Sequence, residues 1–157
     1  MKKISFRFLL VAILIAVGMV ESNAQVKIGD LYYSLSDSTA EVIQNAEYSS
    51  LTNVVIPETF TYNDKTYTVT SIRNHAFYEC IGLTSVSIPN SVTTIGISAF
   101  SGCTGLTTAE IPNSVTGISK NVFFKCRSLT TVKMSNSVKA IGMYAFLGCN
   151  YRLTSNC

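Results

Sequence analysis

Five cysteines and a single histidine are the side chains of this 157-residue chain with the widest scope for nucleophilic, redox or metal chemistry. Four of the cysteines, Cys80, Cys103, Cys126 and Cys149, recur at a constant interval along the chain. Zinc sites need closely spaced pairs of cysteine or histidine ligands, and the chain has no CxxC pair and no histidine cluster. The sequence therefore predicts no metal site.

The redox state of these cysteines has two interpretations. Secreted proteins form disulfides, and equivalent residues of stacked units would lie about 4.8 Å apart, within reach of a disulfide. Their side chains would nevertheless project in parallel rather than toward one another, so we favour buried, unreactive thiols and keep disulfides as the alternative. Cys157 lies outside the series, and we expect it to be exposed.

The other reactive side chains lack the partners that catalysis requires. His75 stands in an expected turn, where we predict that it faces solvent, and no serine or threonine has the histidine and carboxylate partners of a triad. Glycines recur singly, which is typical of turns and not of a phosphate-binding loop. The sequence predicts neither catalytic residues nor a cofactor, and hence no enzyme.

The 23-residue interval of the cysteines extends to apolar residues and dominates the sequence. Short words repeat with it: LTSVSIPN begins at Leu83, LTTAEIPN at Leu106 and LTTVKMSN at Leu129. Such a period is the signature of a solenoid, in which stacked units bury a continuous core and place equivalent residues above one another. We therefore expect a phenylalanine ladder beside the cysteine ladder, formed by Phe77, Phe100, Phe123 and Phe146.

Each unit contains two short extended segments and a turn. The apolar and β-branched residues after Leu83 favour a strand that Pro89 ends, because proline cannot donate to a sheet ladder. A second extended segment reaches Ile95, and Gly96 opens a segment too short for more than a helical turn. The pattern predicts a mainly β repeat solenoid with short helical or 3-10 turns.

The segment from Leu83 to Cys103, LTSVSIPNSVTTIGISAFSGC, closely resembles the consensus of the BspA-like leucine-rich repeats, the LRR_5 type of surface protein. The resemblance covers residues 51–149. It implies a right-handed, curved solenoid with a sheet along one face, in a secreted or surface-displayed bacterial protein. It names no ligand.

The ends of the chain differ from the repeats. Residues 1–24 have a basic start, an apolar run of 13 residues and small residues before Gln25, which predicts a signal peptide and not a membrane span; no cysteine is present there for lipidation. Residues 25–50 are expected to form an amino-terminal cap, with strands at 28–35 and 40–44 around a turn. Two β-prone runs around 63–65 predict a protruding hairpin within residues 59–69.

Residues 150–157 are interpreted as an incomplete carboxyl-terminal end. Leu153 follows Cys149 by four residues, whereas earlier leucines follow their cysteines by three, and no polar cap is evident. An open last unit would expose backbone groups that pair with another chain, so truncation and end-to-end association are both retained as hypotheses.

Composition and charge exclude some classes of partner. Hydrophobic residues make up 47% and charged residues 13% of the chain, which suits one folded domain and not a nucleic-acid-binding or disordered protein. Residues 25–64 hold six acids and one base, whereas residues 120–152 hold six bases and no acid. The bases Lys120, Lys125, Arg127, Lys133 and Lys139 form a candidate anion-binding group, with a simple solvated face as the alternative.

The leading functional prediction is a secreted or cell-surface protein-binding or adhesion module without enzymatic activity. Host proteins or extracellular matrix are the expected partners, and no membrane span should remain after removal of the signal peptide. Two alternatives stay open: a self-associating structural protein of the cell envelope, and a glycan-binding module that uses the basic carboxyl-terminal repeats.

Overall fold

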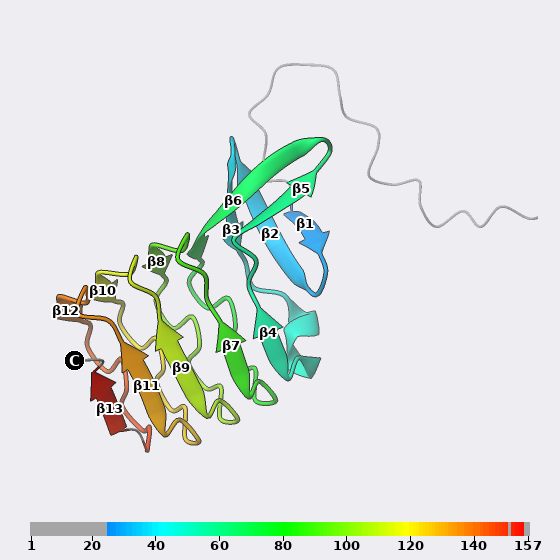
Figure 1. The fold of residues 1–157 in the computed structure, drawn as a ribbon. Coiled ribbons are helices and arrows are strands. Elements are labelled where there is room, and N and C mark those ends of the chain that lie inside the picture. Colours follow the sequence, from blue (N-terminus) through cyan, green and yellow to red (C-terminus); the bar gives the residue numbers. More distant parts are fainter. Residues whose placement is uncertain (1–24, 151, 156–157) are drawn as a thin grey trace, which may run out of the picture.

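The computed structural model describes residues 25–150 and 152–155. The predicted signal peptide and Cys157 lie outside these residues. Between them, the chain winds into a stack of coils in which almost every regular element is a strand, as Figure 1 shows. Each complete coil contains a strand of a large sheet, a strand of a second layer, and a connecting turn segment, which is the mainly β repeat fold expected from the sequence.

The large sheet has five parallel strands, one from each successive coil, and β4 and β13 form its two edges (Figure 1). Strand β9 pairs with β7 through Thr108 opposite Ser85, and β11 pairs with β9 through Thr131 opposite Thr108. The repeat interval of the sequence is therefore also the interval between these paired residues. The strands are β4 (Asn53–Val55), β7 (Ser85–Ser87), β9 (Thr108–Ile111), β11 (Thr131–Met134) and β13 (Arg152–Ser155).

The strand β13 changes the interpretation of the last coil. Leu153 is paired with Val132 in the parallel register of β13 and β11. It therefore occupies the position of the strand valines, and the comparison of its spacing with that of the ladder leucines was wrong. The second layer of these later coils consists of two-residue strands, β8 (Thr94–Ile95), β10 (Gly117–Ile118) and β12 (Ala140–Ile141).

The amino-terminal segment adds antiparallel strands beside the second layer. They are β1 (Gln25–Ile28), β2 (Leu31–Ser36) and β3 (Thr39–Val42), and the 3-10 helix η1 (Ala46–Ser50) follows them. The prediction of one strand at 28–35 was wrong, because Gly29 adopts a positive φ of 58° and a turn at Gly29-Asp30 separates β1 from β2. The helix η1 was not predicted. The strand expected at 40–44 is β3, which ends at Val42, two residues earlier than the prediction.

Residues 59–72 form an antiparallel hairpin of β5 (Thr59–Tyr62) and β6 (Lys65–Ile72), which extends from the stack in Figure 1. Both turn residues, Asn63 and Asp64, have positive φ, as a tight turn between twisted strands requires. The strand β6 also pairs in parallel with β3 and β8, and it thereby joins the amino-terminal strands to the repeats.

The core runs through the stack as columns of equivalent side chains. The rings of Phe77, Phe100 and Phe123 are fully buried, and Phe146 is 8% exposed. Consecutive ring centroids are 5.1, 5.5 and 5.5 Å apart, and the interplanar angles do not exceed 14°. At the amino-terminal end, the ring of Tyr48 stacks on Phe77 at 5.0 Å, so η1 continues the aromatic column.

The turn segments hold two left-handed residues in each coil. One position has positive φ at His75, Ser98, Asn121 and Tyr144, and the other, four residues later, at Glu79, Gly102, Lys125 and Gly148. The positive φ directs the amide toward the next coil, where it donates to a carbonyl; Lys125 N donates to Leu147 O at 2.8 Å, for example. Hydrogen bonds between coils therefore offset the cost of this backbone conformation.

Within the residues that the structure describes, no helix is long and apolar enough to cross a membrane.

Candidate binding surface

The structure places the four ladder cysteines in one column inside the stack. Cys80, Cys103 and Cys126 are buried, Cys149 is partly buried, and all four are free thiols. Each of the last three thiols donates to the carbonyl oxygen of a phenylalanine in the preceding coil; the Cys103 thiol and Phe77 O, for example, are 3.0 Å apart. The side chains therefore point at backbone oxygens.

The surroundings of the three buried thiols suppress their reactivity. Burial raises the pKa of Cys80 to about 11 and that of Cys103 to about 12. The interaction with Cys149, together with burial, raises the pKa of Cys126 as well, and the same interaction lowers the pKa of the partly buried Cys149. Because the thiolate is the nucleophile, the three buried thiols of Cys80, Cys103 and Cys126 remain protonated at neutral pH and pack as small apolar residues.

The remaining reactive side chains are not assembled into a site. His75 is exposed in a turn, and its ring lies edge-on to Tyr78 with the centroids 5.6 Å apart. Among the described residues, no group of three or more histidine, cysteine or acidic side chains could hold a metal ion.

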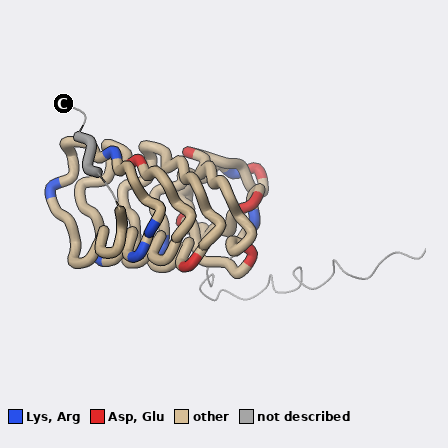
Figure 2. Tube along the Cα trace, turned by 90° about the horizontal axis from the view of Figure 1, so that it is seen from below, with Lys and Arg blue, Asp and Glu red and all other residues tan. Residues whose placement is uncertain are grey.

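The five basic residues singled out in the sequence do not gather in one patch. Lys133 lies on the outward face of β11, Lys120 and Lys125 lie in the turn segment between β10 and β11, and Lys139 directly precedes β12. Arg127 is exposed in the turn before β11. Figure 2 shows the basic segments at separate places along the coils, whereas acidic segments gather toward the amino-terminal end of the stack.

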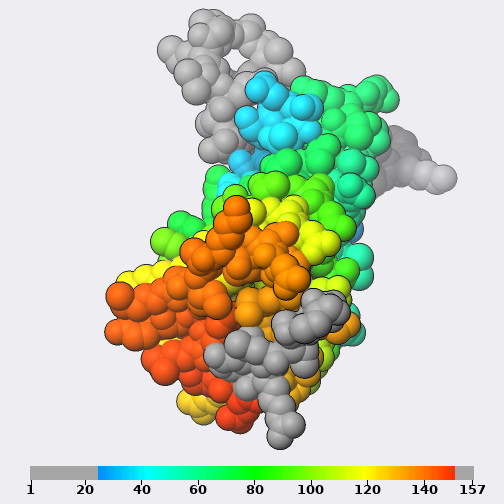
Figure 3. All heavy atoms as spheres, turned by 60° about the vertical axis from the view of Figure 1, so that its left-hand side comes forward, coloured from blue at the N-terminus to red at the C-terminus, as the bar shows by residue number. Residues whose placement is uncertain are grey.

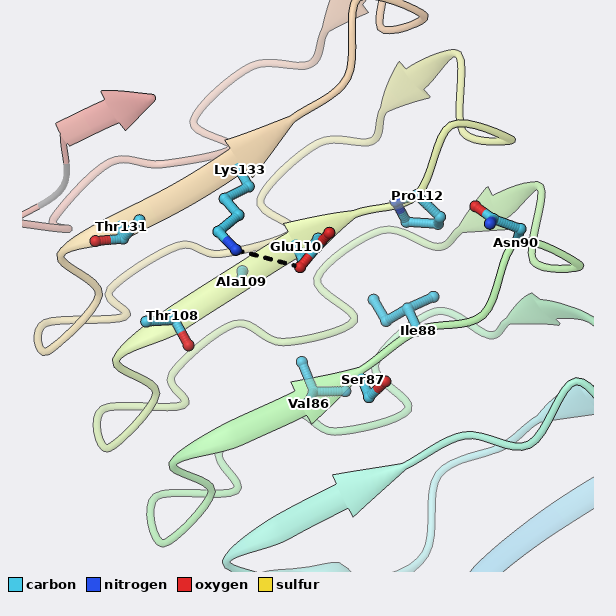
Figure 4. A pocket seen from close by; sticks show the side chains of 10 residues that line it. All are labelled: Val86, Ser87, Ile88, Asn90, Thr108, Ala109, Glu110, Pro112, Thr131 and Lys133. Carbon is cyan, nitrogen blue, oxygen red and sulfur yellow. Dashed lines mark ion pairs between the residues drawn. The ribbon is translucent and has the colours of Figure 1, made fainter. Parts of the chain in front are cut away.

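The five-stranded sheet presents an outward face that crosses five successive coils. Inward-facing strand residues, such as Val86, Ala109 and Val132, are buried in the core. Between them, Ser87, Glu110 and Lys133 form a row across β7, β9 and β11 that faces solvent, as Figure 4 shows. A parallel sheet with short, tightly connected strands holds such side chains on a rigid frame.

This face is hollowed beside the row of outward side chains. One depression of about 410 Å³ spans β7, β9 and β11, with Ile88 and Pro112 at its margin in Figure 4. A second, of about 540 Å³, continues from Glu110 and Lys133 along the loop after β11. The two share the Glu110–Lys133 ion pair, whose nitrogen and oxygen are 3.7 Å apart. Both side chains are more than half exposed, so either can exchange this pairing for a partner's charge.

Charge singled out Lys133 in the sequence, but Ser87 and Glu110 were not predicted as site residues. A usable signal was present: these three residues share one repeat position and differ in chemistry, while the apolar residues directly before them hardly vary. In a repeat, residues that stack in the core are held alike by packing, and residues that face solvent are free to differ. Variation at a fixed repeat position therefore marks the exposed face.

Comparison with known families identifies the class of this coil. The BspA type leucine rich repeat region matches residues 44–155 in six copies. The chain belongs to this family of leucine-rich repeats. No curated protein matches the chain.

Solved structures of bacterial leucine-rich repeat proteins share the fold. A leucine-rich repeat protein from Bacteroides ovatus is 31% identical with a TM-score of 0.75, over 83% of this chain and 37% of that protein. One from Bacteroides capillosus is 26% identical with a TM-score of 0.72, over 83% and 98%. The T. pallidum leucine rich repeat protein is 27% identical with a TM-score of 0.62, over 79% and 67%. The chain thus spans little more than a third of the Bacteroides ovatus protein.

Proposed function

We propose that this chain is a secreted or cell-surface adhesion module that binds a partner protein through the outward face of β4, β7, β9, β11 and β13. The observation that carries the proposal is the row Ser87, Glu110 and Lys133, in which residues of differing chemistry stand over two depressions on a rigid sheet. A surface of this kind offers many spaced contacts without a reactive group. Family membership supports an interaction role and a non-enzymatic one.

The finer features of the proposal come from the sequence and the family resemblance. We take the structural unit to be a 23-residue segment, the winding to be right-handed, and the amino-terminal strands to cap the stack. The signal peptide predicted at residues 1–24 supports secretion. Host proteins or extracellular matrix proteins are the proposed partners, because a surface-displayed protein meets these first.

The test is a binding screen of the purified protein against immobilised extracellular matrix proteins, followed by charge reversal on the sheet face. Glu110→Lys and Lys133→Glu should each weaken binding of a retained partner about tenfold, because each reversal sets like charges against the partner's complementary groups. Lys139→Glu, which alters an exposed base outside this face, is the matched control and should bind normally. Equal binding by all three variants, or no binding to any matrix protein, would contradict the proposal.

End-to-end association is a second candidate, favoured by the surface of the last coil. Ile141, Met143, Tyr144 and Leu147 are each more than half exposed there, and Figure 3 shows this coil at the surface of the carboxyl-terminal end. Large exposed apolar side chains of this number mark interaction sites. Light scattering over a concentration series tests the candidate: growth in mass that Met143→Glu abolishes supports it, and a constant monomer mass rejects it.

A further inference from the structure

A polar groove lies on the other layer of the molecule, on the outward face of the sheet formed by β2, β3, β6 and β8. It consists of two depressions that share Glu41 and Arg73. The first, of about 260 Å³, is lined by hydroxyl side chains of β2, β3 and β6, among them Ser34 and Ser71. The second, of about 420 Å³, continues past Thr94 of β8. The groove shares no residue with the proposed protein-binding face.

The backbone is shaped to present polar groups at this place. Ala40 pairs with Val69, but the next residue, Glu41, pairs with Ser71, so Thr70 is an extra residue in β6. Such a bulge turns two successive side chains to the same face, and here Thr70 and Ser71 both line the groove. Glu41 also lies opposite Ser34, so one row of polar residues crosses the strands.

Arg73 is the unusual residue of the groove. It stands where the three following coils have Gly96, Ser119 and Gly142, so the repeat itself does not call for a long side chain. Its Nε donates to Glu41 Oε2 at 2.7 Å, and both side chains remain partly exposed. An ion pair this exposed adds little to stability, so a tie between β3 and β6 is a weak reason for an arginine here.

Several polar atoms of the groove have no partner in the part of the chain that the structure describes. The two terminal nitrogens of Arg73 and the second carboxylate oxygen of Glu41 make no hydrogen bond there, and neither does the hydroxyl of Ser34, which is only 7% exposed. Donors and an acceptor thus lie side by side. This arrangement matches two adjacent hydroxyl groups, of which one accepts from guanidinium and the other donates to carboxylate.

The charges and the apolar residues around the groove restrict the kind of ligand that it can bind. Arg73 and Glu41 neutralise each other, and the neighbouring residues 25–64 carry six acids and one base, so an anionic ligand is disfavoured. The apolar residues of the lining, Ala40 and Ile72, are themselves buried and offer little contact area to an apolar ligand. A neutral, hydroxyl-rich molecule fits these constraints.

We propose that this groove binds a neutral oligosaccharide, with one sugar ring on each side of the Arg73–Glu41 ion pair. The ion pair meets the hydroxyls at the centre, and the serine and threonine hydroxyls of the two depressions meet those of the flanking rings. Without an aromatic ring for stacking, binding is weak, with a dissociation constant on the order of 1 mM.

The experiment is a titration of the isotope-labelled protein with cellotriose, mannotriose or the trimer of N-acetylglucosamine, followed by backbone amide chemical shifts. At least one of these neutral probes should shift the amides of Ser71, Arg73 and Thr94 saturably. Glu41→Gln and Arg73→Gln should each weaken that binding at least tenfold. Failure of all three probes to shift these amides, or shifts confined to β7, β9 and β11, would overturn the proposal.

Two controls separate binding from stability and from the protein-binding proposal. The double variant Glu41→Arg with Arg73→Glu exchanges the two charges, so it should keep an ion pair and the melting temperature. It moves the hydrogen-bond donors and the acceptor to new places and should therefore no longer bind the sugar. Normal binding by this variant rejects the proposed contacts. Lys27→Gln breaks the exposed ion pair between Lys27 of β1 and Glu47 of η1, away from the groove, and should bind the sugar normally. Lys133→Glu should also bind it normally, because that residue belongs to the protein-binding face.

Discussion

Truncation of one ring in the phenylalanine column tests the core of the fold most directly. Phe100 is fully buried between Phe77 and Phe123, so Phe100→Ala removes a side chain that contacts a ring on both sides. A buried phenylalanine removes about 150–250 Å² from water, worth about 4–6 kcal/mol as an upper bound at roughly 25 cal/mol per Å². Truncations of a buried phenylalanine to alanine typically cost about 3–5 kcal/mol of folding stability, and we expect Phe100→Ala to lower the free energy of unfolding by about 4 kcal/mol.

The same substitution at the end of the column supplies the internal comparison. Phe146 is 8% exposed and is the last phenylalanine of the column, 5.5 Å from Phe123, so Phe146→Ala should cost about half as much. Thermal unfolding followed by circular dichroism should show a fall of more than about 10 °C for Phe100→Ala and a clearly smaller one for Phe146→Ala. Equal shifts, or an unchanged melt for Phe100→Ala, would refute the stacked column as the source of stability.

Three further predictions concern the backbone and the thiols. Gly105→Ala should lower the free energy of unfolding by about 1–3 kcal/mol, since its new Cβ would lie 2.6 Å from Ile81 O. Gly117→Ala is the control: its Cβ would meet nothing nearer than 3.9 Å, so its urea unfolding should be close to that of the parent protein. Lys125→Gly should stabilise by about 0.5 kcal/mol, because glycine adopts the φ of 58° without strain, as at the equivalent Gly102 and Gly148; Lys120→Gly, at a residue without positive φ, should destabilise. The free energy of unfolding should fall above pH 9, because unfolded thiols lose protons near pKa 9.0 while Cys80 and Cys103 retain theirs to about 11 and 12. Between pH 9 and 10, a Cys103→Ala variant should lose about 1 kcal/mol less of its free energy of unfolding than the parent protein, and an equal loss would contradict the buried thiol.

The sequence could predict the repeat architecture because packing imposes the same residue at the same place in every coil. The interval between Phe100 and Phe123 directly reflects one turn of the coil, so a ladder follows from counting. The hairpin around Asn63 and Asp64 was equally accessible, because these residues tolerate the positive φ that its tight turn needs.

The missed features depend on tertiary contacts or on backbone geometry without a sequence marker. In the turn segments of the repeats, Gly102 and Gly148 mark a left-handed position, but Lys125 at the same position gave no sign of its positive φ. The groove residues Glu41 and Arg73 are 32 positions apart and meet only because β3 pairs with β6. The five bases of the candidate anion-binding group are neighbours in the sequence but lie in different elements, because one coil places successive segments in the two layers and in the turns between them.

The serial construction of the stack also governs its response to force. Each inner coil contacts only its two neighbours, and one full repeat of chain separates the paired residues of β7, β9 and β11. A pull along the stack therefore loads all the junctions in series, so the weakest junction parts first, and each detached coil extends from about 5 Å of stack to roughly 75 Å of chain. Such a chain would release length coil by coil under tension, and each release would lower the force along the chain.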